Sequence, residues 1–147
     1  MKAKKRELAG RLAILTPNKR EEKVLNEGGI RVESVLYDSS KDGLAQATYE
    51  FDRFLPANAV VTRVFSDELV ALTSSGSATL QLKAGSTALT DAIAFDTGFA
   101  NSQSQALASS ATAIKLSSRS ELKLTVAAAD LTAGKVRFYV EYMLAND

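Results

Sequence analysis

Apolar and polar residues follow two different periods along this chain. Within residues 1–29 the leucines recur at the spacing of an amphipathic helix, whereas from Ile30 onward apolar and polar positions alternate one by one. Alternation of that kind places successive side chains on opposite faces of a strand. The pattern predicts an all-β domain over residues 30–147, preceded by an N-terminal arm over residues 1–29 that is partly helical or extended.

The early strands are expected to follow one another as hairpins. Residues 30–36 alternate, with one face formed by Ile30, Val32, Ser34 and Leu36 and the other by Arg31, Glu33 and Val35. A polar turn at 38–43 leads to residues 47–51, which alternate again and predict the returning strand. Residues 59–65 form a nearly unbroken β-branched run, which is typical of a strand covered on both faces.

The middle of the chain adds another hairpin and a long connection. Residues 69–72 and 79–83 flank the turn sequence Ser-Ser-Gly-Ser at 74–77, which predicts a hairpin. Residues 84–111 are rich in Ala, Ser, Thr and Gly. They are expected to form a long connection that holds one short strand near residues 92–95.

The final strands show the clearest alternation. They cover residues 122–126 and 136–142, and Gly134 is expected to close the turn between them. Together with the earlier runs this makes about eight short strands at the spacing typical of sandwiches. The sequence therefore predicts a single β-sandwich or jelly-roll domain.

Composition removes most catalytic chemistry from consideration. The chain of 147 residues has no histidine, no cysteine and no tryptophan. It therefore cannot form a Ser-His-Asp triad, a thiol nucleophile, or a zinc or iron–sulfur site with His or Cys ligands. We expect a non-enzymatic structural or binding protein with no catalytic residue, no cofactor and no metal site.

Two carboxylate patterns echo functional motifs. The stretch Asp-Ser-Ser-Lys-Asp-Gly at 38–43 is similar to the start of a calcium loop, but the twelfth position, where an EF-hand needs Glu, is Tyr49. A plain hairpin turn is the favoured interpretation. Glu50 and Asp52 would share a strand face, as glycosidase carboxylates can. Because sugar sites usually offer aromatic platforms and the chain lacks Trp, a solvated strand face is favoured there.

Charge is concentrated in the arm. Residues 1–31 carry nine Lys or Arg against four Glu, a net charge of +5, and residues 32–147 carry a net charge of −4. A basic arm with interleaved leucines suits docking onto a protein surface. A solvated tail and a nucleic-acid contact are the alternatives, the latter disfavoured because the arm has no aromatic residue. The residues expected to dock are Lys2, Lys4, Lys5, Arg6, Leu8, Arg11, Leu12, Leu15, Lys19 and Arg20.

Two further features bear on contacts between copies of the chain. Tyr139 is a candidate anchor in a subunit interface, although the simpler interpretation is that Phe138 and Tyr142 pack into the core and Tyr139 is partly exposed. Residues 69–120 contain only five charged residues. A surface with so little charge suits permanent contact with neighbouring copies, and long Ser- and Ala-rich loops explain it equally well.

No segment is suited to crossing or targeting a membrane. Glu7 and Arg11 interrupt the apolar part of the first fifteen residues, so no export signal is expected. Charge also breaks every apolar stretch before the roughly 20 residues that a spanning helix needs. We therefore expect no membrane partner.

Three segments carry a resemblance to a known group of proteins. They are LPANAVVTRV at 55–64, SGSATLQL at 75–82 and LKLTVAAADLTAGKVRFYVEY at 122–142. These segments resemble small virion structural proteins of tailed bacteriophages, and among them most of all capsid cement (decoration) proteins. The resemblance covers roughly residues 30–144 and leaves the arm outside. It implies a β-sandwich or jelly-roll module, often trimeric, that sits on the shell where capsomers meet.

The resemblance implies a function as well as a fold. We expect a cement protein that binds the outside of a phage head and stabilises contacts between major capsid protein subunits. Its expected partners are the major capsid protein, held by the arm, and further copies of itself in a homotrimer. Such a protein is made in the bacterial cytoplasm and ends on the capsid surface of the virion. The alternatives are another virion component, such as a head fibre or tail-associated protein, and a carbohydrate-binding attachment module.

Overall fold

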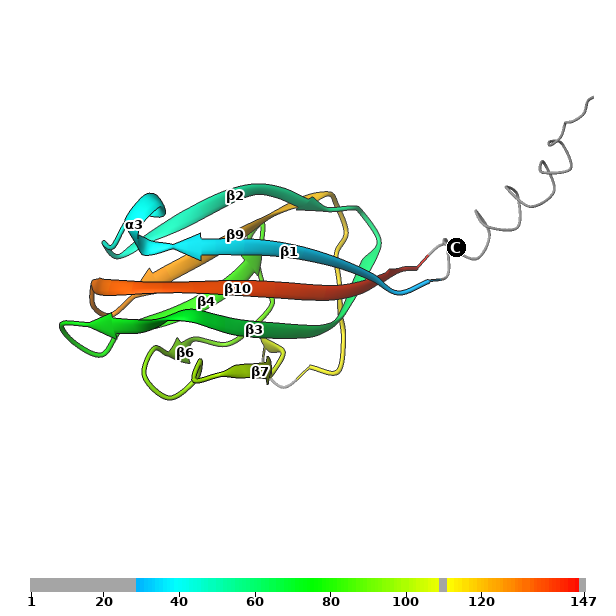
Figure 1. Cartoon of the computed structure of the whole chain (residues 1–147). Coiled ribbons are helices and arrows are strands. Elements are labelled where there is room, and N and C mark those ends of the chain that lie inside the picture. Colours follow the sequence, from blue (N-terminus) through cyan, green and yellow to red (C-terminus); the bar gives the residue numbers. More distant parts are fainter. Residues whose placement is uncertain (1–28, 109–110, 146–147) are drawn as a thin grey trace, which may run out of the picture.

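Two antiparallel sheets face each other in the computed structural model, which describes residues 29–108 and 111–145 (Figure 1). A four-residue helix, α3 (Ser39–Asp42), follows the first strand. Sheet A consists, in order across the sheet, of β1 (Arg31–Asp38), β10 (Leu131–Leu144), β3 (Ala59–Ser74) and β7 (Ser102–Gln105), with β8 (Ile114–Lys115) also paired to β3. Sheet B consists of β2 (Ala47–Leu55), β9 (Ser120–Ala127), β4 (Thr79–Ala84) and β5 (Thr87–Ala88), with β6 (Ile93–Ala94) also paired to β4.

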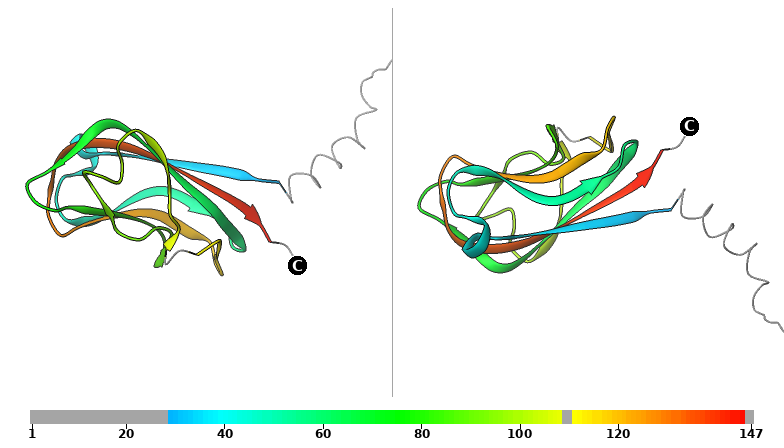
Figure 2. Two further views of the ribbon diagram at one scale, coloured as in Figure 1. Left: turned by 90° about the horizontal axis from the view of Figure 1, so that it is seen from below. Right: turned by 90° about the horizontal axis from the view of Figure 1, so that it is seen from above.

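The chain passes from one sheet to the other at most of its long connections. Strands β1 and β3 lie in sheet A, β2 and β4 lie in sheet B, and β9 in sheet B leads to β10 in sheet A. Figure 2 shows the resulting two layers from above and below. This arrangement of two Greek-key sheets is a jelly roll, so the predicted all-β sandwich or jelly-roll class is confirmed. The short strand predicted near 92–95 is also present, as β6.

The predicted hairpins are wrong, all for the same reason. Residues 30–36 and 47–51 fall in β1 and β2, which belong to different sheets, and residues 69–72 and 79–83 fall in β3 and β4, which also belong to different sheets. The last two strands are divided in the same way. Alternation reveals which side chains face the core, but a strand that bridges to the opposite layer has the same alternation as one that turns back beside its neighbour.

Strand β3 changes its inward side along its length. Opposite Glu141, β3 has one extra residue, Thr62, which forms a β-bulge. Because of the bulge, Val61 and Val64 both face the core although they are three positions apart. The prediction that residues 59–65 are covered on both faces is therefore wrong. The apolar run is continuous because the core-facing side switches within it.

Gly134 lies inside β10 and does not close a turn, contrary to the prediction. Its φ is 140°, and the register of β10 on β3 shifts on both sides of it. A Cβ atom at this position would overlap Leu72 Cδ2 and lie 2.9 Å from Leu72 Cα. Glycine is needed here because it allows both the positive φ and the close approach of the two strands. The change of sheet takes place at residues 128–130, between β9 and β10.

One hydrophobic core fills the space between the sheets. Its largest fully buried side chains include Tyr37 of β1, Phe138 of β10, Leu122 and Leu124 of β9, and Phe99. The rings of Phe99 and Phe138 meet edge to face, with their centroids 5.9 Å apart. Phe99 belongs to the long connection between β6 and β7, so this Ser- and Ala-rich segment contributes to the core as well as to the surface.

Candidate assembly surface

The outer face of sheet A, which we call the A face, carries an aromatic row at its middle. The register pairs Ser34 of β1 with Tyr139 of β10, Tyr139 with Phe65 of β3, and Phe65 with Ser104 of β7. The neighbours of Tyr139 in β10 are fully buried, so alternation along the strand places the Tyr139 side chain on the outer face. Tyr139 and Phe65 are both half-buried there. The structure therefore places Tyr139 on the surface next to a second aromatic side chain.

A shallow hollow of about 450 Å³ adjoins this aromatic row. Phe65 and Tyr139 form its apolar part, and Asp67 and residues 102–104 of β7 supply hydroxyl, amide and carboxylate groups. Ser102 Oγ donates a hydrogen bond to Asp67 Oδ1 at 2.8 Å, which fixes the polar side. A half-buried tyrosine next to a hollow is the usual setting of an anchor residue in an interface.

Exposed aliphatic side chains continue the A face towards the end where the described chain begins. Ile30 is 65% exposed, Val32 is 59% exposed and Met143 is 37% exposed. Met143 pairs with Val60, which is half-buried on the same outer face. Figure 1 shows that β1 begins and β10 ends side by side at this end of the molecule. Residues 30–36 therefore have a mostly apolar outward side in addition to the inward-facing Val35.

The charged residues of the A face lie next to residues of opposite charge. Arg63 Nε lies 3.9 Å from Glu141 Oε1. The central guanidinium carbon of Arg63, Cζ, lies 5.6 Å from the centre of the Phe65 ring. Arg137 and Asp67 are register partners across β10 and β3. Because the positive and negative groups alternate within reach of each other, this face has little net charge.

The outer face of sheet B, which we call the B face, is polar in its central rows. Thr48 of β2 and Thr125 of β9 share a hydrogen bond of 2.9 Å. On the other side of Thr125, its register partner on β4 is Gln81. Lys123 Nζ lies 3.3 Å from Glu50 Oε2 in the adjacent row. Side chains of this kind are well solvated, so the two faces of the sandwich differ sharply in character.

Carboxylates bind backbone N–H groups along the free edges of sheet A. On β1, the N–H of Ser34 donates to Glu33 Oε1 at 3.2 Å, and the N–H of Asp38 donates to Asp42 Oδ2 at 2.8 Å. On β3, beyond the part paired with β7, the N–H of Leu72 donates to Glu68 Oε2 at 3.0 Å. Groups that a foreign strand would need are thus already bound, which protects the edges against strand addition.

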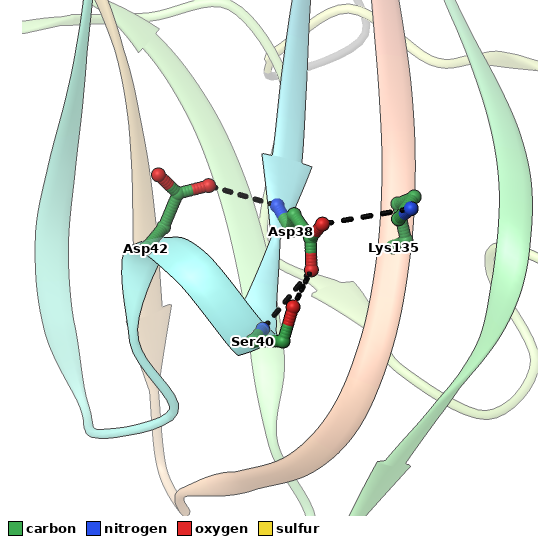
Figure 3. A network of polar contacts seen from close by, with 4 residues as sticks. All are labelled: Asp38, Ser40, Asp42 and Lys135. Atoms are coloured by element: carbon green, nitrogen blue, oxygen red, sulfur yellow. Dashed lines mark hydrogen bonds and ion pairs between the residues drawn. The ribbon is translucent and has the colours of Figure 1, made fainter.

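The stretch that is similar to a calcium loop is a helix cap (Figure 3). Asp38 Oδ1 accepts hydrogen bonds from Ser40 N at 3.0 Å and Ser40 Oγ at 2.6 Å, and Asp38 Oδ2 lies 3.5 Å from Lys135 Nζ. The bonds from Ser40, helped by Lys135, lower the pKa of the Asp38 carboxyl. The carboxylates at 38 and 42 hold α3 against sheet A, and the expected hairpin turn is replaced by this short helix.

A buried tyrosine completes this corner. Tyr37 Oη donates a 2.6 Å hydrogen bond to the carbonyl of Gly43, and burial raises the pKa of the Tyr37 hydroxyl. The ring packs against Tyr49 with centroids 5.5 Å apart. Within residues 29–108 and 111–145, no cluster of three or more His, Cys, Asp or Glu is placed to hold a metal ion.

The second carboxylate pattern has a different geometry from the one predicted. The register of β2 on β9 shifts between Glu50 and Phe54. Within this segment Asp52 adopts a φ of 53°. The N–H of Asp52 donates to Glu121 Oε2 at 3.0 Å. Glu50 and Asp52 therefore do not have the relation of i and i+2 residues in a regular strand, and Glu50 is paired with Lys123.

The predicted site residues divide into two groups. The arm residues expected to dock, from Lys2 to Arg20, lie outside the described residues. Tyr139 lies on the A face, where the structure adds Phe65, Val32 and Met143 as exposed or half-buried neighbours. A signal for Val32 was present in the sequence, because the alternating side formed by Ile30, Val32, Ser34 and Leu36 is mostly apolar.

Comparison with known proteins identifies the fold. No protein-family model and no curated protein matches the sequence. Among solved structures, a chain in the acidic stable capsid structure of Helicobacter pylori bacteriophage KHP30 matches with a TM-score of 0.58 at 12% identity, covering 82% of this chain and 91% of that chain. A chain in the capsid asymmetric unit of cyanophage Pam1 matches with a TM-score of 0.59 at 19% identity, covering 81% and 87% respectively.

These matches concern the whole fold. Because the alignments cover most of both chains, the matched chains are close to this one in length and consist mainly of the same jelly roll. At these low identities the likeness establishes the fold alone. In the described part of the chain, no helix has the length and apolar character required to span a bilayer.

Proposed function

We propose that this protein is a structural component of a bacteriophage virion, and more narrowly a capsid cement protein on the outside of a phage head. The observation that carries the proposal is the jelly roll, which chains of similar length in two phage capsids share over more than four fifths of their residues. The resemblance in residues 55–64, 75–82 and 122–142 supports the same class. A solvent-facing surface with apolar and aromatic groups suits a protein that works by contact.

The uneven distribution of charge suggests separate roles for the arm and the domain. The arm over residues 1–29, which carries eight Lys or Arg against four Glu, would hold the major capsid protein, with Lys2, Arg6 and Arg11 among the docking residues and the three leucines covering apolar surface. The domain over residues 30–147 would form a homotrimer with Tyr139 in its interface. Many copies on one shell make modest individual contacts effective through multivalency. Such a protein needs no catalysis, in agreement with the lack of His and Cys.

Copy number and add-back test this proposal. Quantitative mass spectrometry of the virion that contains the protein should find it in amounts comparable to the shell protein, and not in the few copies of a portal or tail component. Purified protein added to particles stripped of it should restore their resistance to heat. Low copy number would transfer the assignment to a head fibre or tail-associated protein.

A carbohydrate-binding attachment module is the second candidate, and one observation favours it. The hollow on the A face combines two aromatic side chains with the polar groups of Asp67 and Ser102. Rings of sugars stack on aromatic side chains while hydroxyl groups need such polar neighbours. A glycan array with the full-length protein tests this candidate, and binding that Tyr139→Ala abolishes would support it.

A further inference from the structure

We infer that the A face is the contact surface between copies of this chain, with the Tyr139–Phe65 row near the common axis. The inference names the face that the proposed homotrimer uses, and to that extent it rests on the proposed function. The Arg63–Glu141 and Lys135–Asp38 pairs and the blocked strand edges carry it, together with the contrast between the two outer faces.

The two outer faces differ in what their burial would gain. Ile30, Val32 and Met143 are exposed on the A face or directly beside it, and half-buried aromatic rings lie at its middle. The central rows of the B face instead contain threonine, glutamine and paired charges. Both faces carry paired charges, but the A face also offers exposed apolar and half-buried aromatic groups whose covering gains free energy, so the A face gains more from a partner.

The charge pattern of the A face indicates the identity of that partner. A face on which Arg63 is paired with Glu141, and Arg137 faces Asp67, has little net charge and presents both signs. Residues close to a rotation axis meet their own copies, so a face of mixed charge does not repel its copies there. A partner that bound through charge would need a surface of one sign. The composition of the A face therefore fits a second copy of the chain.

The edges of sheet A disfavour the commonest other way for β-proteins to associate. Copies could pair by adding strands there, but Glu33 and Asp42 already accept the N–H groups of Ser34 and Asp38 on β1. Glu68 does the same for β3. Association through the face leaves these bonds intact, whereas strand addition at these positions would have to break them.

Introduced cysteines give a direct test, because the natural chain has none. Full-length protein with Val32→Cys, Ser34→Cys or Ser104→Cys on the A face is oxidised mildly and run on a non-reducing gel. We expect at least one of these variants to form disulfide-linked dimers within the oligomer, since disulfides need Cβ atoms about 4 Å apart. Thr48→Cys on the B face is the matched control and should stay uncrosslinked. Crosslinking of Thr48→Cys alone would overturn the inference.

The mass in solution gives a second test. Light scattering of the full-length protein should show an oligomer, and Val32→Glu combined with Tyr139→Ala should reduce it to the mass of one chain. Thr48→Glu should leave the oligomer unchanged. Because the A face is neutral, oligomer dissociation should change little between about 0.1 M and about 1 M NaCl, where the screening length falls from about 10 Å to about 3 Å. Dissociation by salt would point to the charged arm and overturn the inference.

Failure of this inference can be separated from failure of the proposed function. If the double variant remains an oligomer and still binds stripped particles, the A face is not the contact and the cement assignment stands. If the wild-type protein is an oligomer that depends on the A face but does not bind the particles, the inference stands and the cement assignment fails. Circular dichroism of each variant shows whether it is folded.

Discussion

Single carboxylates accept hydrogen bonds from backbone N–H groups at several places in and beside the strands of this protein. Besides those at the edges of sheet A, Asp130 accepts a hydrogen bond from Gln46 N, and Glu121 accepts one from Asp52 N, each at 3.0 Å. An ionised acceptor forms a stronger hydrogen bond than a neutral one. These two bonds therefore tie the backbone near the start and in the irregular part of β2 to β9 and to the residue before β10.

Asp38 allows the contribution of one such carboxylate to be tested by pH. Its pKa is lowered in the folded protein, so its charged form stabilises the fold above the unfolded-state pKa, and this contribution is lost as the pH falls through the folded-state pKa. We expect Asp38→Asn, which keeps an oxygen to cap α3, to show a weaker loss of stability in acid than the wild type. Urea unfolding at several pH values down to about pH 2 measures it. The exposed Asp96→Asn is the control, and superimposable acid profiles for wild type and Asp38→Asn would contradict the expectation.

Gly134 combines a positive φ with a close approach to Leu72, so an added methyl group should be harmful there. Gly134→Ala introduces a clash with Leu72 and an unfavourable positive φ, and we expect it to lower the free energy of unfolding by about 2–5 kcal/mol. Gly85→Ala is the matched control. Gly85 also has a positive φ, of 60°, but the nearest atoms to its added Cβ would be 3.5 Å away. It should cost only about 1 kcal/mol. Equal losses in urea unfolding would show that the approach to Leu72 is unimportant.

At the scale of the strands, the sequence predicted which segments are extended far better than how they pair. Residues 30–36, 47–51 and 122–126 are strands as expected, because an alternating pattern depends only on which side faces the core. Pairing depends on which layer receives each strand after its turn. In this chain the decisive features are irregular, namely the bulge at Thr62 and the left-handed or glycine positions near residues 128 and 134.

The candidate site was predictable only in part, for a related reason. Tyr139 stood out because an aromatic residue followed Phe138 in a clearly alternating strand. Its neighbour Phe65 was hidden within an apolar run that appeared to belong to the core. The bulge at Thr62 places Phe65 outward, and a bulge in one strand is set by contacts with its partner that local sequence does not contain.

The bulge in β3 can be tested by removing it. Deleting Thr62 would place Val61 directly beside Arg63, opposite Tyr142 and Glu141, so β3 would pair without a bulge and its buried residues would still face the core. We therefore expect the variant to keep a cooperative thermal transition. Deletion of Thr125, which lies between the buried Leu124 and Val126 in a regular part of β9, is the matched control; it would turn one part of that strand to the opposite face and should abolish the transition. Loss of the transition in the Thr62 deletion would show that the bulge itself is required for folding.

At the scale of the whole molecule, the division into an arm and a domain predicts that the domain folds on its own. The buried apolar side chains of the described residues run from Val35 to Tyr142. A chain that starts at Gly29 contains all of them. We therefore expect residues 29–147 to unfold cooperatively within a few degrees of the full-length protein in a thermal scan at the same ionic strength. A large drop would mean that the domain begins earlier in the chain than residue 30.

The pairing of the first and last strands also determines how the molecule would bear a pulling force. Arg31 is paired with Tyr142, so both strands leave the sandwich at the same end (Figure 1). Pulling the two ends apart would peel the pairs of β1 and β10 open one after another, like a zipper. Pulling on the arm alone, against a body held by its face, would load all the pairs of β1 at once in shear. The fold would therefore resist tension transmitted through its arm better than tension applied between its two ends.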